Sequence, residues 1–176
     1  MPLKDDGLLP VKQPRGTEER MSTPTRTYLV IMDDSGEARS ALRFAARRAA
    51  KTGGRLEVLA LIAAQDFVQW GGVQAAIEEE QQLRIEAEVA AALGELPGTD
   101  GLRPGSIMIR AGEPAAIVRD LLGERDDITA LVLGTAPAGD PGPLVAAFTG
   151  SDSGKLPCPV MLIPGGLSDD RLEALS

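Results

Sequence analysis

The sequence contains no histidine and one cysteine, and aromatic residues make up only 3% of its 176 residues. Without histidine, the chain cannot build a Ser-His-Asp or Cys-His nucleophilic site, a two-histidine zinc site or an imidazole switch near neutral pH. A single cysteine excludes a disulfide within the chain, so the fold must be stable through its core. Cys158 lies between two prolines before an apolar run, which favours a buried, inert thiol and is consistent with a reducing compartment.

Cationic side chains are also scarce, and no long apolar run is present. The chain has 18 Lys and Arg against 26 Asp and Glu, a formal net charge of −8. This balance argues against nucleic acid or an anionic membrane surface as a partner. No window approaches the ~18 apolar residues of a membrane span, and the first residues lack a signal-peptide pattern. We expect a cytoplasmic protein with no nucleic acid and no membrane as partners.

The composition divides the chain into three parts. Residues 1–26 combine four prolines with mixed charges and no periodicity, which predicts a disordered N-terminal tail. Met21 is a candidate for the true start within it. Residues 27–166 are the expected folded domain, and residues 167–176 the expected C-terminal tail, in which Ser168 can cap a short helix.

Apolar runs alternate with helical patterns through the expected domain. Strands are predicted at residues 28–32, 56–62, 106–110, 129–133 and 160–163. Helices are predicted after Ser35, over 73–93, from Pro114 and from Pro143. We interpret the acidic residues of the second helix as a solvated face rather than a metal site. The alternation predicts an α/β fold: a three-layer α/β/α sandwich with a five-stranded parallel sheet, Rossmann-like and of the adenine nucleotide alpha hydrolase-like type.

Familiar phosphate-binding motifs are incomplete or missing. The stretch from Gly150 to Lys155 resembles a P-loop, but three residues separate its glycines where four are needed, and Leu156 replaces the magnesium-binding Ser or Thr. The Gly-x-Gly-x-x-Gly dinucleotide fingerprint is absent. A phosphoacceptor receiver domain would need an Asp after the third strand and a Lys after the fifth, where the chain has Arg110 and Pro164.

Taken in order, several short motifs resemble the universal stress protein family (UspA-like domains) from about Tyr28 to Pro164. The motifs are a first strand ending in Asp33 with Ser35 close behind, Gly112-Glu113-Pro114 at a helix start, Leu131-Val-Leu-Gly-Thr135, and the closing Pro157-Cys-Pro-Val-Met-Leu-Ile-Pro164. The resemblance implies a stress-response protein with this fold. It also implies a homodimer formed through the fifth strand, at Val160, Met161, Leu162 and Ile163. Further protein partners are expected, but the sequence does not identify them. With no histidine and no evident nucleophile–base pair, we expect no enzymatic activity.

One branch of this family binds ATP through Gly-x-x-Gly, nine residues, and Gly-Ser or Gly-Thr. Here Gly134 matches the first glycine, but Pro137 takes the second position and has no N–H. After nine intervening residues stands Ala147, and the pair Gly150-Ser151 comes three residues too late. The resemblance therefore points to a branch with a degenerate motif, in which ATP would bind weakly or atypically. The alternatives are an interaction module without nucleotide and an ATP-binding switch or slow ATPase.

By position, a small set of residues should line the nucleotide pocket: Ile31, Asp33, Leu61, Leu133, Gly134, Gly139, Gly142, Gly150 and Ser151. Asp33 could accept a hydrogen bond from a ribose hydroxyl or a base amine, or it could only belong to the turn before the helix. The sequence favours neither reading. The segment from Gln65 to Gln74, with the only tryptophan, either covers the pocket or contacts a partner.

Overall fold

The computed structural model describes residues 25–33, 35–62, 74–94, 96, 99, 102–150 and 153–176, apart from the side chains of 62, 74–78, 103 and 104. Most of the expected N-terminal tail and nearly all of the segment 65–74 lie outside these residues. In chain order the elements are β1 (Thr27–Met32), α1 (Gly36–Thr52), β2 (Arg55–Ile62), α2 (Gln74–Gly94), β3 (Arg103–Ala111), α3 (Pro114–Glu124), β4 (Ile128–Thr135), α4 (Pro143–Thr149), the 3₁₀ turn η2 (Ser153–Lys155), β5 (Val160–Pro164) and α5 (Asp169–Leu175).

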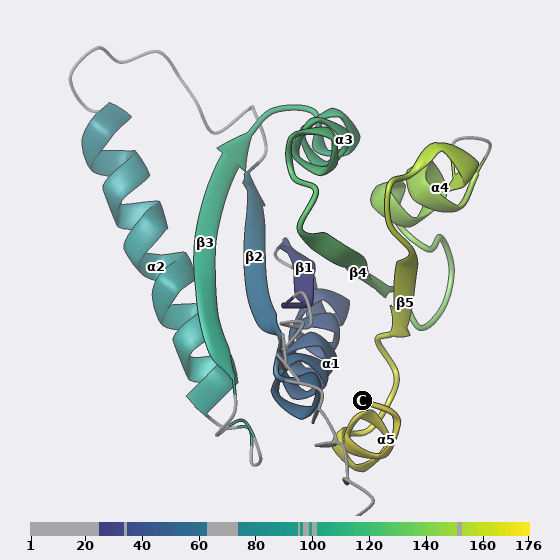
Figure 1. The fold of residues 1–176 in the computed structure, drawn as a ribbon. Coiled ribbons are helices and arrows are strands. Elements are labelled where there is room, and N and C mark those ends of the chain that lie inside the picture. The colour runs from purple at the N-terminus through teal and green to yellow at the C-terminus, as the bar shows by residue number, and fades with distance from the viewer. Residues whose placement is uncertain are drawn as a thin grey trace, which may run out of the picture.

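The strands form one parallel sheet in the order β3-β2-β1-β4-β5. Helices α1, α2 and α5 pack on one face and α3 and α4 on the other (Figure 1). The strand order reverses between β1 and β4, because β2 and β3 extend the sheet on one side and β5 on the other. The predicted three-layer sandwich with five parallel strands is confirmed.

Both faces of the sheet are covered by aliphatic side chains. All six residues of β1 are buried, with Val30 facing α1 and Leu29 facing α3. The α1 side of the contact is made largely of alanines, and Ala41 and Ala45 are 0% exposed. Small side chains let the helix approach the sheet closely, so a core with few aromatic residues can still exclude water.

Capping residues begin the helices where the sequence predicts. The Ser35 hydroxyl accepts a hydrogen bond from the Ala38 amide at 3.3 Å at the start of α1. At the start of α3, the Glu113 carboxylate accepts hydrogen bonds from the Ala115 and Ala116 amides at 3.0 and 2.6 Å. These caps satisfy amides that have no partner within the helix. They also set both helix starts at the carboxyl edge of the sheet.

Strand β3 begins at Arg103, three residues before its predicted start. It contains a bulge, since Leu56 pairs with Pro104 whereas Val58 pairs with Ile107. A Cβ on Gly105 would overlap the Leu56 carbonyl oxygen, so glycine permits the bulge. A bulge interrupts the alternation of side chains along a strand, which is why the sequence pattern indicated only the segment after it.

The bulge lies opposite a buried carboxylate, Glu57, which is 3% exposed. Arg125 donates to both of its oxygens, at 3.1 and 3.0 Å, and the Ser106 hydroxyl donates at 3.3 Å. Arg125 also forms two hydrogen bonds with Asp127, at 2.6 and 2.8 Å. These bonds connect β2, β3 and the turn between α3 and β4. Hydrogen bonding to Arg125 holds the pKa of Asp127 below its ordinary value near 3.8.

The C-terminal residues pack onto the domain instead of forming a separate tail. Leu172 of α5 is 1% exposed and belongs to the core on the α1 face. Arg43 forms an ion pair with Asp169 at 2.9 Å, and the Lys51 ammonium donates to the Ser176 carbonyl at 3.0 Å. The predicted short helix after Ser168 is confirmed. In a polar stretch, one leucine was too weak a signal for the sequence to predict this packing.

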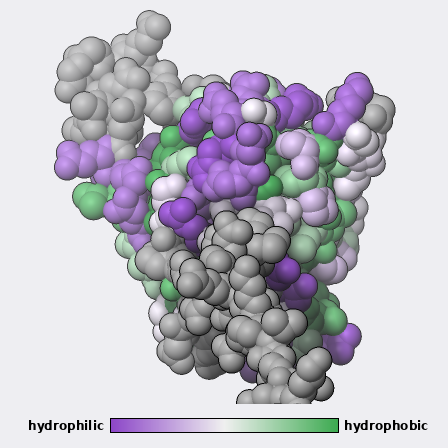
Figure 2. All heavy atoms as spheres, viewed as in Figure 1, coloured by the Kyte–Doolittle hydropathy of each residue, from purple (hydrophilic) through white to green (hydrophobic). Residues whose placement is uncertain are grey.

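The exposed surface over α3 is charged, with Arg119, Asp120 and Glu124 at its solvent side. Figure 2 shows hydrophilic side chains gathered over this region. In the described part of the chain, no helix is long and apolar enough to cross a membrane.

The Arg125–Asp127 pair makes stability depend on acid pH. Because the folded pKa of Asp127 is lowered, the pair stabilises the fold above about pH 4, and this contribution is lost as pH falls through the folded pKa. The free energy of unfolding of Asp127→Asn should therefore fall less than that of the wild type between about pH 5 and pH 2. Urea denaturation across this range measures the effect, with the exposed neighbour Asp126→Asn as the control. An identical pH dependence in wild type and Asp127→Asn would contradict the assignment.

Candidate functional site

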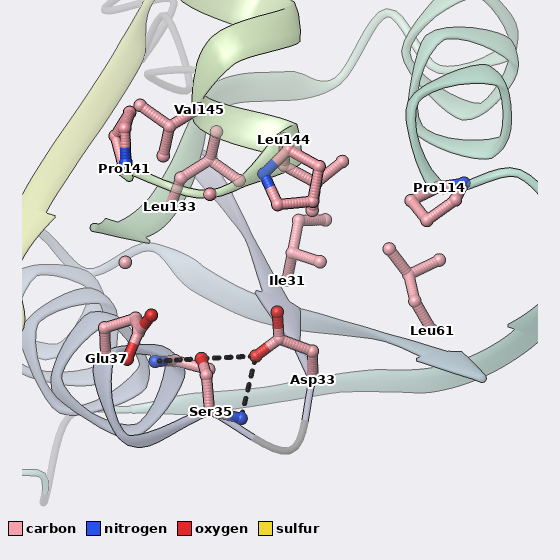
Figure 3. Close-up of a pocket in the computed structure, with 14 residues that line it drawn as sticks. Ile31, Asp33, Ser35, Glu37, Leu61, Pro114, Leu133, Pro141, Leu144 and Val145 are labelled. Carbon is pink, nitrogen blue, oxygen red and sulfur yellow. Dashed lines mark hydrogen bonds between the residues drawn. The ribbon is translucent and has the colours of Figure 1, made fainter. Parts of the chain in front are cut away.

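A crevice of about 440 Å³ opens at the carboxyl ends of β1 and β4 (Figure 3). Where the strand order of an open parallel sheet reverses, two neighbouring strands lead into helices on opposite faces of the sheet. Ligands bind in the gap between these two connections. The volume falls within the roughly 300–1,000 Å³ of pockets that hold small molecules. Its lining residues are Ile31, Asp33, Ser35, Glu37, Ala38, Leu61, Pro114, Leu133, Gly134, Pro141, Gly142, Pro143, Leu144 and Val145.

The crevice has an apolar base and two different ends. Ile31, Leu133 and Val145 are buried at 3%, 2% and 6% exposure and belong to the core under α3 and α4. In Figure 3, Leu61 and Pro114 lie at one end, Glu37 and Pro141 at the other, and Asp33 between them. One end therefore offers flat apolar contact, and the middle and far end offer carboxylates.

The two carboxylate oxygens of Asp33 have different surroundings. Its Oδ1 accepts from the Ser35 amide at 3.0 Å and from the Ser35 hydroxyl. These bonds close the turn from β1 into α1. The other carboxylate oxygen points toward the crevice in Figure 3. Both interpretations of Asp33 from the sequence therefore fit the structure: one oxygen belongs to the turn before α1, and the other is placed to accept a hydrogen bond from a ligand.

Gly134 is needed for packing at the end of β4. A Cβ at this position would overlap the Glu37 carbonyl group and lie 2.9 Å from the Ala38 nitrogen. The first turn of α1 therefore passes directly against the backbone of β4. A glycine that matches a phosphate-binding motif has here a steric reason to be glycine, independent of any ligand.

The loop between β4 and α4 ends at three residues, 141–143, that offer no free amide. Gly139 and Gly142 have φ values of 84° and 98°, in the region that favours glycine. The Gly142 amide already donates to the Asp140 carboxylate at 3.1 Å. Pro143, the first residue of α4, has no N–H to donate. Ala147, where the ATP motif would have glycine, lies inside α4 and packs on the core.

The structure brings together six of the nine residues expected at the pocket: Ile31, Asp33, Leu61, Leu133, Gly134 and Gly142. Gly139 and Gly150 are not among the lining residues. Gly139 lies in an exposed turn, and Gly150 follows the last residue of α4, about 10 Å along the helix from its start. Ser151 lies outside the described residues.

Several lining residues were not proposed from the sequence, including Glu37, Ala38, Pro114, Leu144 and Val145. They share one signal: each lies at the start of a helix that follows a strand. In a parallel sheet the carboxyl ends of all strands share one edge, so the first turns of the following helices meet there. Counting positions within motifs does not capture this relation.

Cys158 lies away from the crevice and is half-buried. Burial raises the pKa of its thiol, which lowers the fraction of reactive thiolate at neutral pH. In the described residues, no three His, Cys, Asp or Glu side chains come together as a metal site.

Residues 24–164 match the universal stress protein family. The fold is similar to the universal stress protein UspA from Lactobacillus plantarum, at 19% identity and a TM-score of 0.51 over 80% of this chain and 99% of that one. It is similar to a universal stress protein family member from Burkholderia pseudomallei, at 20% identity and a TM-score of 0.54 over 81% of this chain and 98% of that one. It is also similar to a universal stress protein from Archaeoglobus fulgidus in complex with dAMP, at 19% identity and a TM-score of 0.52 over 80% of this chain and 99% of that one. No curated protein sequence matches the chain.

The close contact at Gly134 predicts a large cost for any side chain there. Gly134→Ala should lower the free energy of unfolding by about 2 kcal/mol or more, because the added methyl must displace the first turn of α1. Urea denaturation followed by circular dichroism measures the change. Gly123→Ala is the matched control: a Cβ at this α3 position meets nothing within 4 Å, so stability should hold or rise by up to about 1 kcal/mol. Equal effects of the two substitutions would contradict the packing role.

Proposed function

Because the chain belongs to the universal stress protein family, we propose that it is a cytoplasmic, dimeric, non-catalytic stress-response protein whose crevice binds an adenine nucleotide weakly. The observation that carries the ligand assignment is the crevice itself. It lies where the strand order reverses, and Asp33 directs a carboxylate oxygen into it. The solved Archaeoglobus fulgidus relative in complex with dAMP supports an adenine nucleotide as the ligand class.

The two ends of the crevice suit different parts of a nucleoside. The apolar surfaces of Leu61 and Pro114 can cover the faces of a base. The Asp33 carboxylate can accept a hydrogen bond from a sugar hydroxyl, and bonds to an ionised acceptor are the stronger kind. Weak binding is expected because residues 141–143, at the end of the loop that would hold phosphates, offer no free amide.

A non-catalytic role is supported by the chemistry of the polar groups at the crevice. The Ser35 hydroxyl donates to Asp33 and accepts from the Ala38 amide, so it serves the start of α1. The chain has no histidine to act as a general base near neutral pH. A slow ATPase would need another group to activate water.

Binding can be tested with AMP by isothermal titration calorimetry. We expect AMP to bind and Asp33→Ala to weaken binding about tenfold, the loss of roughly one charge-assisted hydrogen bond. Ser35→Ala is the control, because it removes the hydroxyl bond of the turn and leaves both the bond from the Ser35 amide and the carboxylate. An equal loss in Ser35→Ala would show that Asp33 acts only through the turn. No binding of AMP by the wild type would refute the nucleotide assignment.

The proposal of a dimer is supported by strand β5. Within the described residues, β5 pairs only with β4 and so forms one edge of the sheet. Leu162 is 39% exposed at this edge, while Ile163 is buried. An exposed apolar edge strand is a template for pairing with another chain. Pro159 and Pro164 flank the segment and limit the pairing to a few residues.

Leu162→Asp should convert the dimer into monomers, because a charge would be buried without a partner at the interface. Light scattering after size-exclusion chromatography measures the mass. Leu83→Asp is the control, since Leu83 is 60% exposed on α2 and should tolerate the charge. A dimer that persists in Leu162→Asp would exclude this edge as the interface.

A further inference from the structure

The charge of the crevice is of one sign. Among the described residues that line it, two are carboxylates, Asp33 and Glu37, and none is Lys or Arg. A third carboxylate, Asp140, lies in the adjoining loop and accepts from the Gly142 amide. Like charges within several ångströms repel, most strongly where water is partly excluded. The crevice therefore disfavours an anionic ligand and favours one that donates hydrogen bonds.

Three consecutive lining residues offer no free backbone N–H to offset this charge. Proteins that hold phosphates without cationic side chains do so with several free amides directed at the oxygens. Here Pro141 and Pro143 have no N–H, and the Gly142 amide is bonded to Asp140. The neutral amides of the next turn, at Leu144 and Val145, would therefore have to offset two carboxylates.

We propose that the crevice selects the unphosphorylated nucleoside over its phosphorylated forms, so that affinity falls from adenosine to AMP to ATP. The inference rests on the proposed function for the identity of the base. The apolar end at Leu61 and Pro114 and the acceptor at Asp33 match a neutral nucleoside. Each added phosphate brings negative charge toward Glu37, and no Lys or Arg among the described lining residues balances it.

Magnesium is the one agent that could reverse this order, because it can bridge phosphates and carboxylates. In the described residues, no group of three acidic side chains forms a metal site that would hold magnesium before the nucleotide arrives. The titration is therefore made both with magnesium and with EDTA.

The test is a calorimetric titration of the full chain with adenosine, AMP and ATP, each with magnesium and with EDTA. ATP should bind at least about tenfold more weakly than adenosine, and higher salt should narrow the gap by screening the repulsion. ATP binding as tight as adenosine, in either condition, would overturn the nucleoside preference while leaving the proposed nucleotide site intact. Failure of all three ligands to bind would overturn the proposed function itself.

A single substitution separates the crevice charge from the net charge of the protein. Glu37→Gln should raise the affinity for ATP several-fold and leave that for adenosine unchanged, because it removes one charge at the phosphate end. Glu124→Gln removes the same charge from the exposed end of α3 and should change neither affinity. If both variants raise ATP affinity equally, the repulsion comes from the whole protein and the crevice assignment is wrong.

Discussion

The structure depends on burying both faces of one parallel sheet with a core that has few aromatic residues. Strand β1 is covered on both sides, and small side chains on α1 allow the helix to approach closely enough to exclude water. The same close approach continues to the end of β4, where Gly134 leaves no room for a Cβ against the first turn of α1. This contact brings Glu37 and Ala38 to the crevice, so the packing of the core determines which groups the site contains.

The amino and carboxyl ends of the strands differ in how their carboxylates are paired. At the amino edge, the buried Glu57 is matched by Arg125 and Ser106, which offsets the cost of removing a carboxylate from water. At the carboxyl edge, Asp33 and Glu37 line the crevice without a cationic neighbour among the described lining residues. The first arrangement connects β2, β3 and the turn between α3 and β4. The second leaves acceptors available, and this contrast is the physical basis for expecting a ligand that donates hydrogen bonds.

A glycine in a motif can have a steric cause, a ligand-binding cause or both. Gly134 matches a family motif, yet the space around it is filled by the backbone of α1. The rest of the motif fails because α4 begins at Pro143 and places Ala147 within a packed helix. Family membership and fold do not depend on the amides of this loop.

The order of strands and helices, the cap at Ser35 and the helix start at Pro114 followed from the sequence, because periodicity and capping are local properties that neighbouring residues determine. Six pocket residues were predictable for a related reason: strand ends in a parallel sheet share one edge. The bulge at Gly105, the packing of Leu172 against the core and the entry of Glu37 into the crevice were decided by tertiary structure alone. Each depends on contacts between residues far apart in the chain, which no local pattern records.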